Sequence, residues 1–104
     1  MHGSNRPAEF DAIRERLQYR EILTILDEQG TTNDKLLYRW LIHVGLAVPA
    51  RKLETMFDRL DDEGLTRSQR IETTRVIEMT REGKEVASGI TNLDWVEPPE
   101  PPAL

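Results

Sequence analysis

Residues 53–65 read LETMFDRLDDEGL, a helical pattern that stops at Gly64 and gives way to a different one. The apolar positions that recur at intervals of three and four, and therefore share one helix face, are Leu53, Met56, Phe57 and Leu60. Pro49 suits a first helical turn, where an amide proton has no partner, and a glycine suits the position after a helix. We therefore predict a helix from Pro49 to about Glu63 that buries one face.

The pattern changes from helical to alternating after Gly64. Residues 65–71 and 74–79 are rich in alternating and β-branched side chains, and only two residues separate them. Two such segments around a two-residue turn predict a β-hairpin. Thr80 can then cap a last short helix over residues 81–88.

Two more helices are predicted before this segment. Residues 8–29 contain no Gly or Pro, and Gly30 lies where a helix would end. This first helix carries apolar residues on two roughly opposite faces: Tyr19, Ile22, Leu23 and Leu26 on one, and Phe10, Ile13 and Leu17 on the other. A second helix follows over residues 33–44. Its predicted buried stripe is Leu36, Leu37, Trp40, Leu41 and Val44, whereas Tyr38 and Ile42 point away from that stripe. Residues 46–48, Leu-Ala-Val, resemble a short strand.

The order helix, helix, short strand, helix, hairpin, short helix predicts a winged helix-turn-helix. This fold class is mainly α, with a three-helix core and a small two-stranded β-hairpin as the wing, and here the N-terminal helix is extended. Such domains place the third helix in the major groove of DNA. We predict a disordered N-terminus over residues 1–7, a winged-helix domain over residues 8–89 and a Pro-rich C-terminal tail over residues 90–104.

Two motifs resemble those of a known superfamily. Residues 53–65 are similar to the passage from recognition helix to wing in many bacterial winged-helix regulators, L-x-x-x-L-x-x-L-x-x-x-G-L. Residues 79–87, MTREGKEVA, resemble the L-T-x-x-G-x-x-x-A ending of the same domains. More narrowly, the whole chain looks like small winged-helix proteins of Mu-like phages and prophages. The resemblance implies DNA binding and transcription regulation. One departure is the start of the third helix, where Val48 or Pro49 replaces the usual Ser or Thr.

Composition excludes several classes of function. The chain has 104 residues, 14 basic and 19 acidic, so its formal net charge of −5 excludes a polycation that coats nucleic acid by charge alone. It has no Cys and two His, which argues against a disulfide framework, a thiol nucleophile and a metal centre rich in Cys or His. No phosphate-binding loop or nucleophile-elbow motif is present. We therefore expect a non-enzymatic, cytoplasmic protein without cofactor or metal.

Basic residues on the third helix and the hairpin are the candidate DNA contacts. On the helix these are Arg51, Lys52, Thr55 and Arg59, and on the wing they are Arg67, Arg70 and Arg75. The alternative is that these residues bind no DNA and form an ordinary solvent-exposed surface, on which basic side chains pair with acidic side chains of the same chain. Residues 49–81 hold seven basic and seven acidic residues, whereas the rest holds seven and twelve. The candidate surface is thus less acidic than the remainder, and we expect weak non-specific affinity with a shallow salt dependence.

Apolar residues outside the predicted core suggest an interface. Phe10, Ile13, Leu17, Tyr38 and Ile42 form the candidate homodimer surface. The alternative is packing within the chain against Ile90, Leu93 and Trp95. Trp95 itself either docks on its own domain, which we favour, or binds a protein partner. His43, the one histidine of the predicted domain, fits a surface position.

Two functions remain open from the sequence. The first is a dimeric, sequence-specific DNA-binding regulator of bacterial or phage origin. The second is a winged-helix adaptor that binds proteins and not DNA, for example in phage morphogenesis or host takeover. The Arg positions on helix and wing favour the first. The acidic balance and the Asp-rich end of the third helix favour the second.

Overall fold

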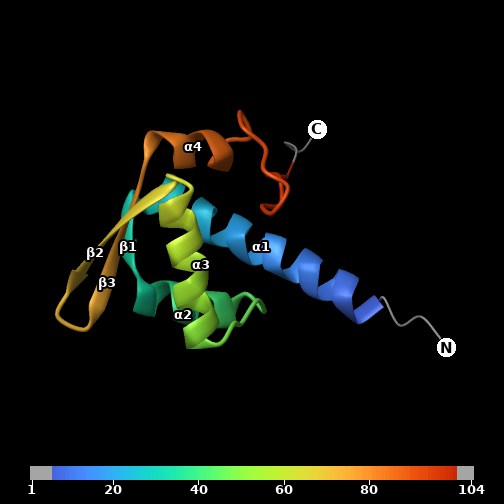
Figure 1. Cartoon of the computed structure of the whole chain (residues 1–104), viewed down its shortest axis with the longest axis horizontal. Helices are drawn as coiled ribbons and strands as arrows, with labels where there is room; N and C mark the ends of the chain where they lie inside the picture. The colour runs from blue at the N-terminus through green and yellow to red at the C-terminus, as the bar shows by residue number, and fades with distance from the viewer. Residues whose placement is uncertain (1–5, 101–104) are drawn as a thin grey trace.

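The computed structural model describes residues 6–100, in which a small sheet lies at one side of four helices (Figure 1). The elements are α1 (Arg6–Gln29), β1 (Thr31–Asn33), α2 (Asp34–His43), α3 (Ala50–Asp62), β2 (Thr66–Ile71), β3 (Thr74–Met79) and α4 (Arg81–Ala87). The strands form one antiparallel sheet in the order β1-β3-β2, and the β2–β3 hairpin lies beside α3. Three helices followed by a hairpin wing confirm the predicted winged helix-turn-helix.

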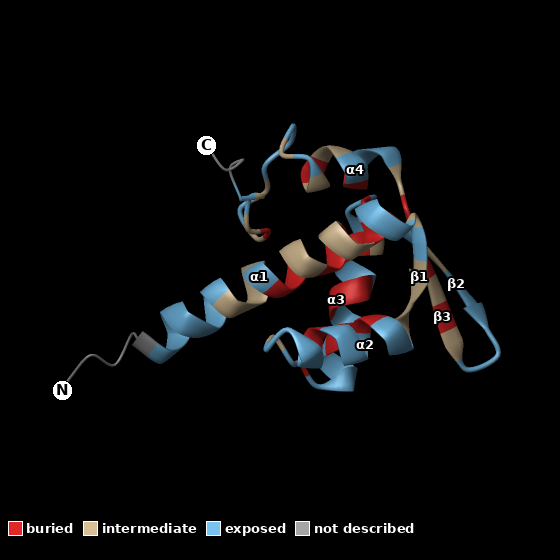
Figure 2. Cartoon of the chain, turned by 180° about the vertical axis from the view of Figure 1, so that it is seen from behind, coloured by how far each residue is buried: buried red, intermediate tan, exposed pale blue. Residues whose placement is uncertain are grey.

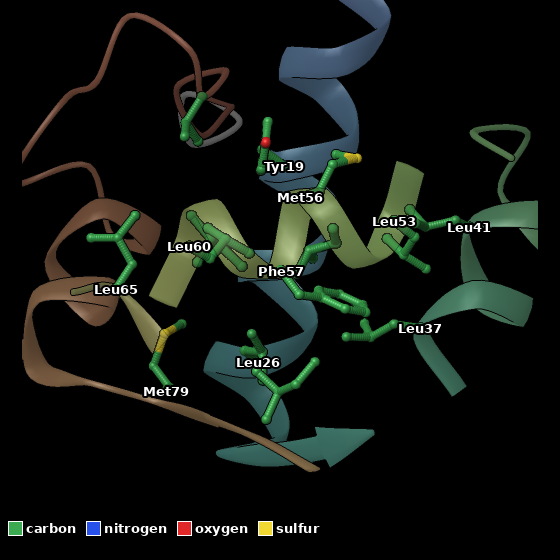
Figure 3. Close-up of a cluster of buried hydrophobic side chains, with 14 of the residues drawn as sticks. Tyr19, Leu26, Leu37, Leu41, Leu53, Met56, Phe57, Leu60, Leu65 and Met79 are labelled. Carbon is green, nitrogen blue, oxygen red and sulfur yellow. The ribbon is translucent and has the colours of Figure 1, made fainter. Parts of the chain in front are cut away.

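The core forms where α1, α2 and α3 meet (Figure 3). All four apolar residues predicted for the third helix are buried, with Leu60 fully so and Leu53 only 2% exposed. They pack in one cluster with residues that lie on a single face of the second half of α1: Tyr19, Ile22, Leu23 and Leu26. Burial of these side chains contributes about 1.5–3 kcal/mol each, which makes this cluster the main source of stability.

The starts of the helices agree with the capping residues in the sequence, including the lack of a side-chain cap at α3. The Oδ1 atom of Asn33 accepts a hydrogen bond from the amide of Leu36 at the start of α2, and Thr80 Oγ1 accepts one from the amide of Gly83 in α4. Helix α3 begins after Pro49 without a side-chain cap. Gly64 has a φ of 79°, the left-handed conformation that a glycine after a helix adopts readily.

The short strand lies elsewhere than predicted. Residues 46–48 pair with no strand, because their carbonyl groups face α1: Gln18 Nε2 donates to the Leu46 oxygen at 3.1 Å. The strand that joins the hairpin is instead β1, in which Thr31 pairs with Glu78 of β3. Its sequence, Thr-Thr-Asn, has no apolar residue, so the strand was not visible in the hydropathy pattern.

Helix α2 buries a narrower stripe than predicted. Only Leu37 and Leu41 are buried, whereas Leu36 is 61%, Trp40 38% and Val44 37% exposed, so the prediction was wrong for these three (Figure 2). The helix has ten residues and rests in the angle between α1, α3 and β3, which covers one side of it. The Trp40 indole instead lies beside α1 and donates a hydrogen bond to Glu21 Oε2 at 2.7 Å.

Residues 6 and 7, which were predicted to be disordered, are folded, and part of the predicted C-terminal tail packs against the domain. Helix α1 begins at Arg6, so residues 6 and 7 are helical, and the first half of α1 extends away from the other elements (Figures 1 and 2). After α4 the chain folds back on α1, where Val96 is 3% exposed. The expected disorder of residues 1–5 lies outside the described residues, as do residues 101–104 of the predicted tail. Within residues 6–100, no helix combines the length and apolar character that crossing a bilayer requires.

Candidate nucleic-acid interface

Two parallel stripes divide the exposed side of α3. Arg51, Thr55 and Arg59 follow one another at intervals of four, so they form a single ridge along the helix. The acidic residues Glu54, Asp58 and Asp61 lie on the other side of this ridge and contact the wing. The charges of residues 51–61 are therefore separated mainly across the helix, into two stripes that run along it, whereas the exposed Asp62 and Glu63 keep its C-terminal end acidic.

The wing neutralises the acidic stripe. Arg75 Nη1 binds Asp58 Oδ1 and Arg75 Nη2 binds Asp61 Oδ2, each at 2.9 Å, and Arg75 Nε donates to Ser68 Oγ at 3.0 Å. Arg70 Nη2 binds Glu54 Oε1 at 2.8 Å. Two wing arginines thus hold three carboxylates of α3, which lowers the negative potential that a phosphate backbone would meet.

Arg75 is a brace between wing and helix and not a free cation. Its side chain is 8% exposed and its guanidinium lies 5.5 Å from the Phe57 ring centre. Burial alone lowers the pKa of Arg75, but hydrogen bonds to Asp58 and Asp61 offset this and raise the pKa above its usual value. Each nitrogen of the Arg75 guanidinium already has a partner within the chain, so Arg75 is not among the proposed DNA contacts.

Strand register separates the other two wing arginines. Arg70 pairs with Arg75 across the hairpin, so both side chains lie on the sheet face that looks toward α3. Arg67 pairs with Glu78 and lies on the opposite face, where the two side chains form an exposed ion pair of 3.4 Å. Of the three arginines, Arg70 alone is both exposed and directed toward α3.

The basic ridge of α3 is open to solvent. Arg51 is exposed and makes no ion pair with any residue in the described part of the chain. Lys52 Nζ lies 3.2 Å from Glu15 Oε1 of α1, an exposed pair that a phosphate can displace at little cost. Arg59 is also exposed and stacks on the ring of Trp95. Arg51, Lys52 and Arg59 present donors on this surface, whereas the Thr55 hydroxyl donates to the Arg51 carbonyl at 3.4 Å and offers its oxygen as an acceptor.

One basic residue near the wing was not among the contacts predicted from the sequence. Lys35, in the first turn of α2, donates from Nζ to the Thr73 carbonyl and to Thr74 Oγ1, both at 3.1 Å. It thereby places a positive charge against the hairpin turn. The contact joins residues 38 positions apart, so no local pattern could have revealed it.

The predicted dimer residues form two separate exposed patches. Phe10, Ile13 and Leu17 lie on the projecting half of α1 and are 62%, 45% and 38% exposed. Tyr38 and Ile42 are exposed on α2, each two residues from Trp40. Because Trp40 faces α1, they lie on the other side of α2.

The alternative of packing within the chain is not observed for the residues on α1. Ile90 is 77% exposed, while Leu93 and Trp95 pack against the core. The preferred docking of Trp95 on its own domain is what the structure shows.

Three other features were considered as sites: a groove along α2, His43 and groups of side chains that could bind a metal. An open apolar groove follows α2 and includes Ile25, Leu36 and Trp40. His43 is exposed beside Trp40, with ring centres 5.2 Å apart, which agrees with a surface role. In the described residues, no group of three or more His, Cys, Asp or Glu side chains could hold a metal ion.

Comparison with solved structures finds a related fold. A crystal structure of a MepR-like protein complexed with pseudoligands is similar to this chain, with a TM-score of 0.54 and 27% sequence identity. The match covers 64% of this chain and 46% of the other, so the chain spans less than half the length of that protein. No protein-family model and no curated protein matches the sequence. The similarity to this structure and the observed order of elements establish a winged helix-turn-helix fold.

Proposed function

We propose that this protein binds double-stranded DNA sequence-specifically, as a homodimer, and regulates transcription in a bacterium or phage. The observation that carries the proposal is the exposed basic ridge of α3, next to Arg70 on the wing. The acidic stripe of the same helix is held by Arg70 and Arg75. The similarity to a MepR-like protein supports the regulatory role.

Helix α3 has the dimensions for direct readout. Its 13 residues span about 20 Å, and a helix fits the major groove, which is about 12 Å wide. Arg51 and Thr55, on the outward ridge, would reach base edges. Lys52 and Arg59 would bind phosphates, and Arg70 with Lys35 would contact the flanking backbone. Regulation would follow from occupying the site or recruiting another protein, without chemistry on the DNA.

The dimer would form through the projecting half of α1. Phe10, Ile13 and Leu17 share one face of this segment, which the rest of the described chain leaves exposed. Two copies would present their α3 helices to half-sites about one DNA turn apart. An Ile13→Asp substitution is expected to shift the sedimentation of the protein from dimer to monomer. Ile90→Asp changes an equally apolar, more exposed residue and should leave the dimer intact.

One observation favours the adaptor as a second candidate. Leu36 and Trp40, one turn apart on α2, are both exposed, and such an apolar surface is typical of protein contacts. The adaptor would use this surface and the first half of α1, and the arginines of α3 and the wing would be dispensable.

The two functions predict different outcomes in one binding experiment. The protein is titrated against a library of fragments from its own genome, and the selected fragment is measured by fluorescence anisotropy at about 50 and 200 mM salt. Arg51→Ala/Arg70→Ala should abolish specific binding. The control Arg81→Ala/Lys84→Ala removes the same charge from exposed positions of α4 and should bind normally. A folded dimer that selects no fragment at micromolar concentration would overturn the regulator proposal in favour of the adaptor.

A further inference from the structure

The segment after α4 brings an aromatic ring to α3. Trp95 lies against α1, where its ring centre is 4.7 Å from that of Tyr19 and the planes meet at 80°. On its other side, the guanidinium carbon of Arg59 stands 4.0 Å from the centre of the Trp95 ring. The C-terminal segment therefore contributes directly to the basic ridge of α3.

Anchors next to Trp95 hold this segment in place. The following residue, Val96, is 3% exposed within the core. Arg20 Nε donates to the Glu97 carbonyl at 2.6 Å, and its two terminal nitrogens donate to the Val86 and Ala87 carbonyls at the end of α4. The Glu97 amide in turn donates to the Arg16 carbonyl at 3.2 Å. The residues that follow Trp95 are thus held on α1, and the Arg20 side chain joins them to the end of α4.

Stacking leaves Arg59 able to bind an anion. A guanidinium that lies flat on an indole uses one face, while its N–H groups point outward along its edge. Within residues 6–100, Arg59 has no carboxylate partner, in contrast to Arg70 and Arg75. Arg59 is therefore a charged donor that lies against two aromatic side chains, Trp95 at 4.0 Å and Tyr19 at 6.0 Å from the ring centres, and not against a competing acid. A phosphate oxygen is the chemical group that this arrangement suits.

We propose that Trp95 is a positioning residue for DNA binding, which holds Arg59 in place to bind a backbone phosphate. This inference rests on the proposed function and adds the C-terminal segment to its site. A side chain that is already ordered loses less entropy on binding, so removing the indole should weaken DNA binding about two- to tenfold. Removing Arg59 itself should also reduce the salt dependence of log K by about one unit per DNA-bound protomer.

A double-mutant cycle on the full chain tests the proposal. The affinity of the selected DNA fragment is measured by anisotropy for wild type, Trp95→Ala, Arg59→Ala and the double variant, over a series of salt concentrations. Trp95→Phe retains an aromatic face and serves as the conservative variant. Thermal melts by circular dichroism establish that each variant is folded at the temperature of the assay.

The expected result is coupling between the two residues. Trp95→Ala weakens binding in the wild type but has little further effect once Arg59 is alanine, and Trp95→Phe restores most of the affinity. An equal loss in both backgrounds would assign Trp95 a purely structural role and overturn the inference. If Arg59→Ala binds DNA as tightly as the wild type, this inference alone is overturned. A folded wild type that binds no DNA would overturn the proposed function as well.

Discussion

Replacing Arg75 with alanine tests how strongly the wing is held to α3. The guanidinium makes two charged hydrogen bonds, and each such bond contributes about 1.5–3 kcal/mol. The side chain of Asp58 is 64% exposed, so water can replace that bond at small cost, whereas Asp61 is 26% exposed and would lose more. Including the lost contact with Phe57, we expect Arg75→Ala to lower the free energy of unfolding by about 2–4 kcal/mol. This is a large part of the about 5–15 kcal/mol typical of a domain.

Urea denaturation followed by circular dichroism measures this loss. Arg67→Ala is the matched control, because Arg67 lies on the same hairpin in an exposed ion pair, and it should cost less than about 0.5 kcal/mol. Combining Arg75→Ala with Asp61→Ala should cost less than the sum of the two single effects. An Arg75→Ala variant as stable as the Arg67→Ala control, or strict additivity with Asp61→Ala, would refute the assignment of Arg75 as a brace.

Three further predictions follow from single residues. Glu54→Gln frees Arg70 from its carboxylate and should tighten DNA binding about two- to fivefold at low salt in anisotropy, and unchanged or weaker binding would contradict this. Burial raises the pKa of Tyr19 above its usual value of 10.0, so the folded state holds this proton more tightly than the unfolded state, and stability is lost as pH rises through and above 10. Between about pH 8 and pH 10.5, the urea midpoint should therefore fall more in the wild type than in Tyr19→Phe. An equal fall in both proteins would contradict the raised pKa of Tyr19. In Gly83→Ala, the new Cβ would overlap the Leu65 carbonyl oxygen, so a thermal melt should show destabilisation of about 3 kcal/mol, and a wild-type melting temperature would show that α4 packs differently.

The parts of the fold that the sequence predicts are those encoded by local periodicity. Leu53, Met56, Phe57 and Leu60 repeat at helical spacing, and all four are buried in α3. The hairpin follows from alternation around a two-residue turn. Strand β1 escaped prediction because its partner, β3, lies more than forty residues away and its side chains are polar. Helix α2 carries apolar residues on several sides, so hydropathy alone could not show which stripe would be covered.

The candidate site was predictable in position but not in its contacts. Helical spacing places Arg51, Thr55 and Arg59 on α3 from sequence alone. The pairing of Arg75 with Asp58 and the stacking of Arg59 on Trp95 each join separate elements. Such contacts depend on how the wing and the C-terminal segment pack, which no spacing rule supplies. They also decide which arginines are available to a ligand.

An NMR titration of the isotopically labelled protein with the selected DNA fragment reports which backbone amides sense the DNA, and so tests whether the protein binds DNA through α3 and the wing. Binding through these elements predicts saturable shifts along residues 50–59 of α3 and around the wing turn at residues 70–75, with little change in α4. Shifts confined to α2 and the first half of α1, or none at DNA concentrations well above that of the protein, would contradict it.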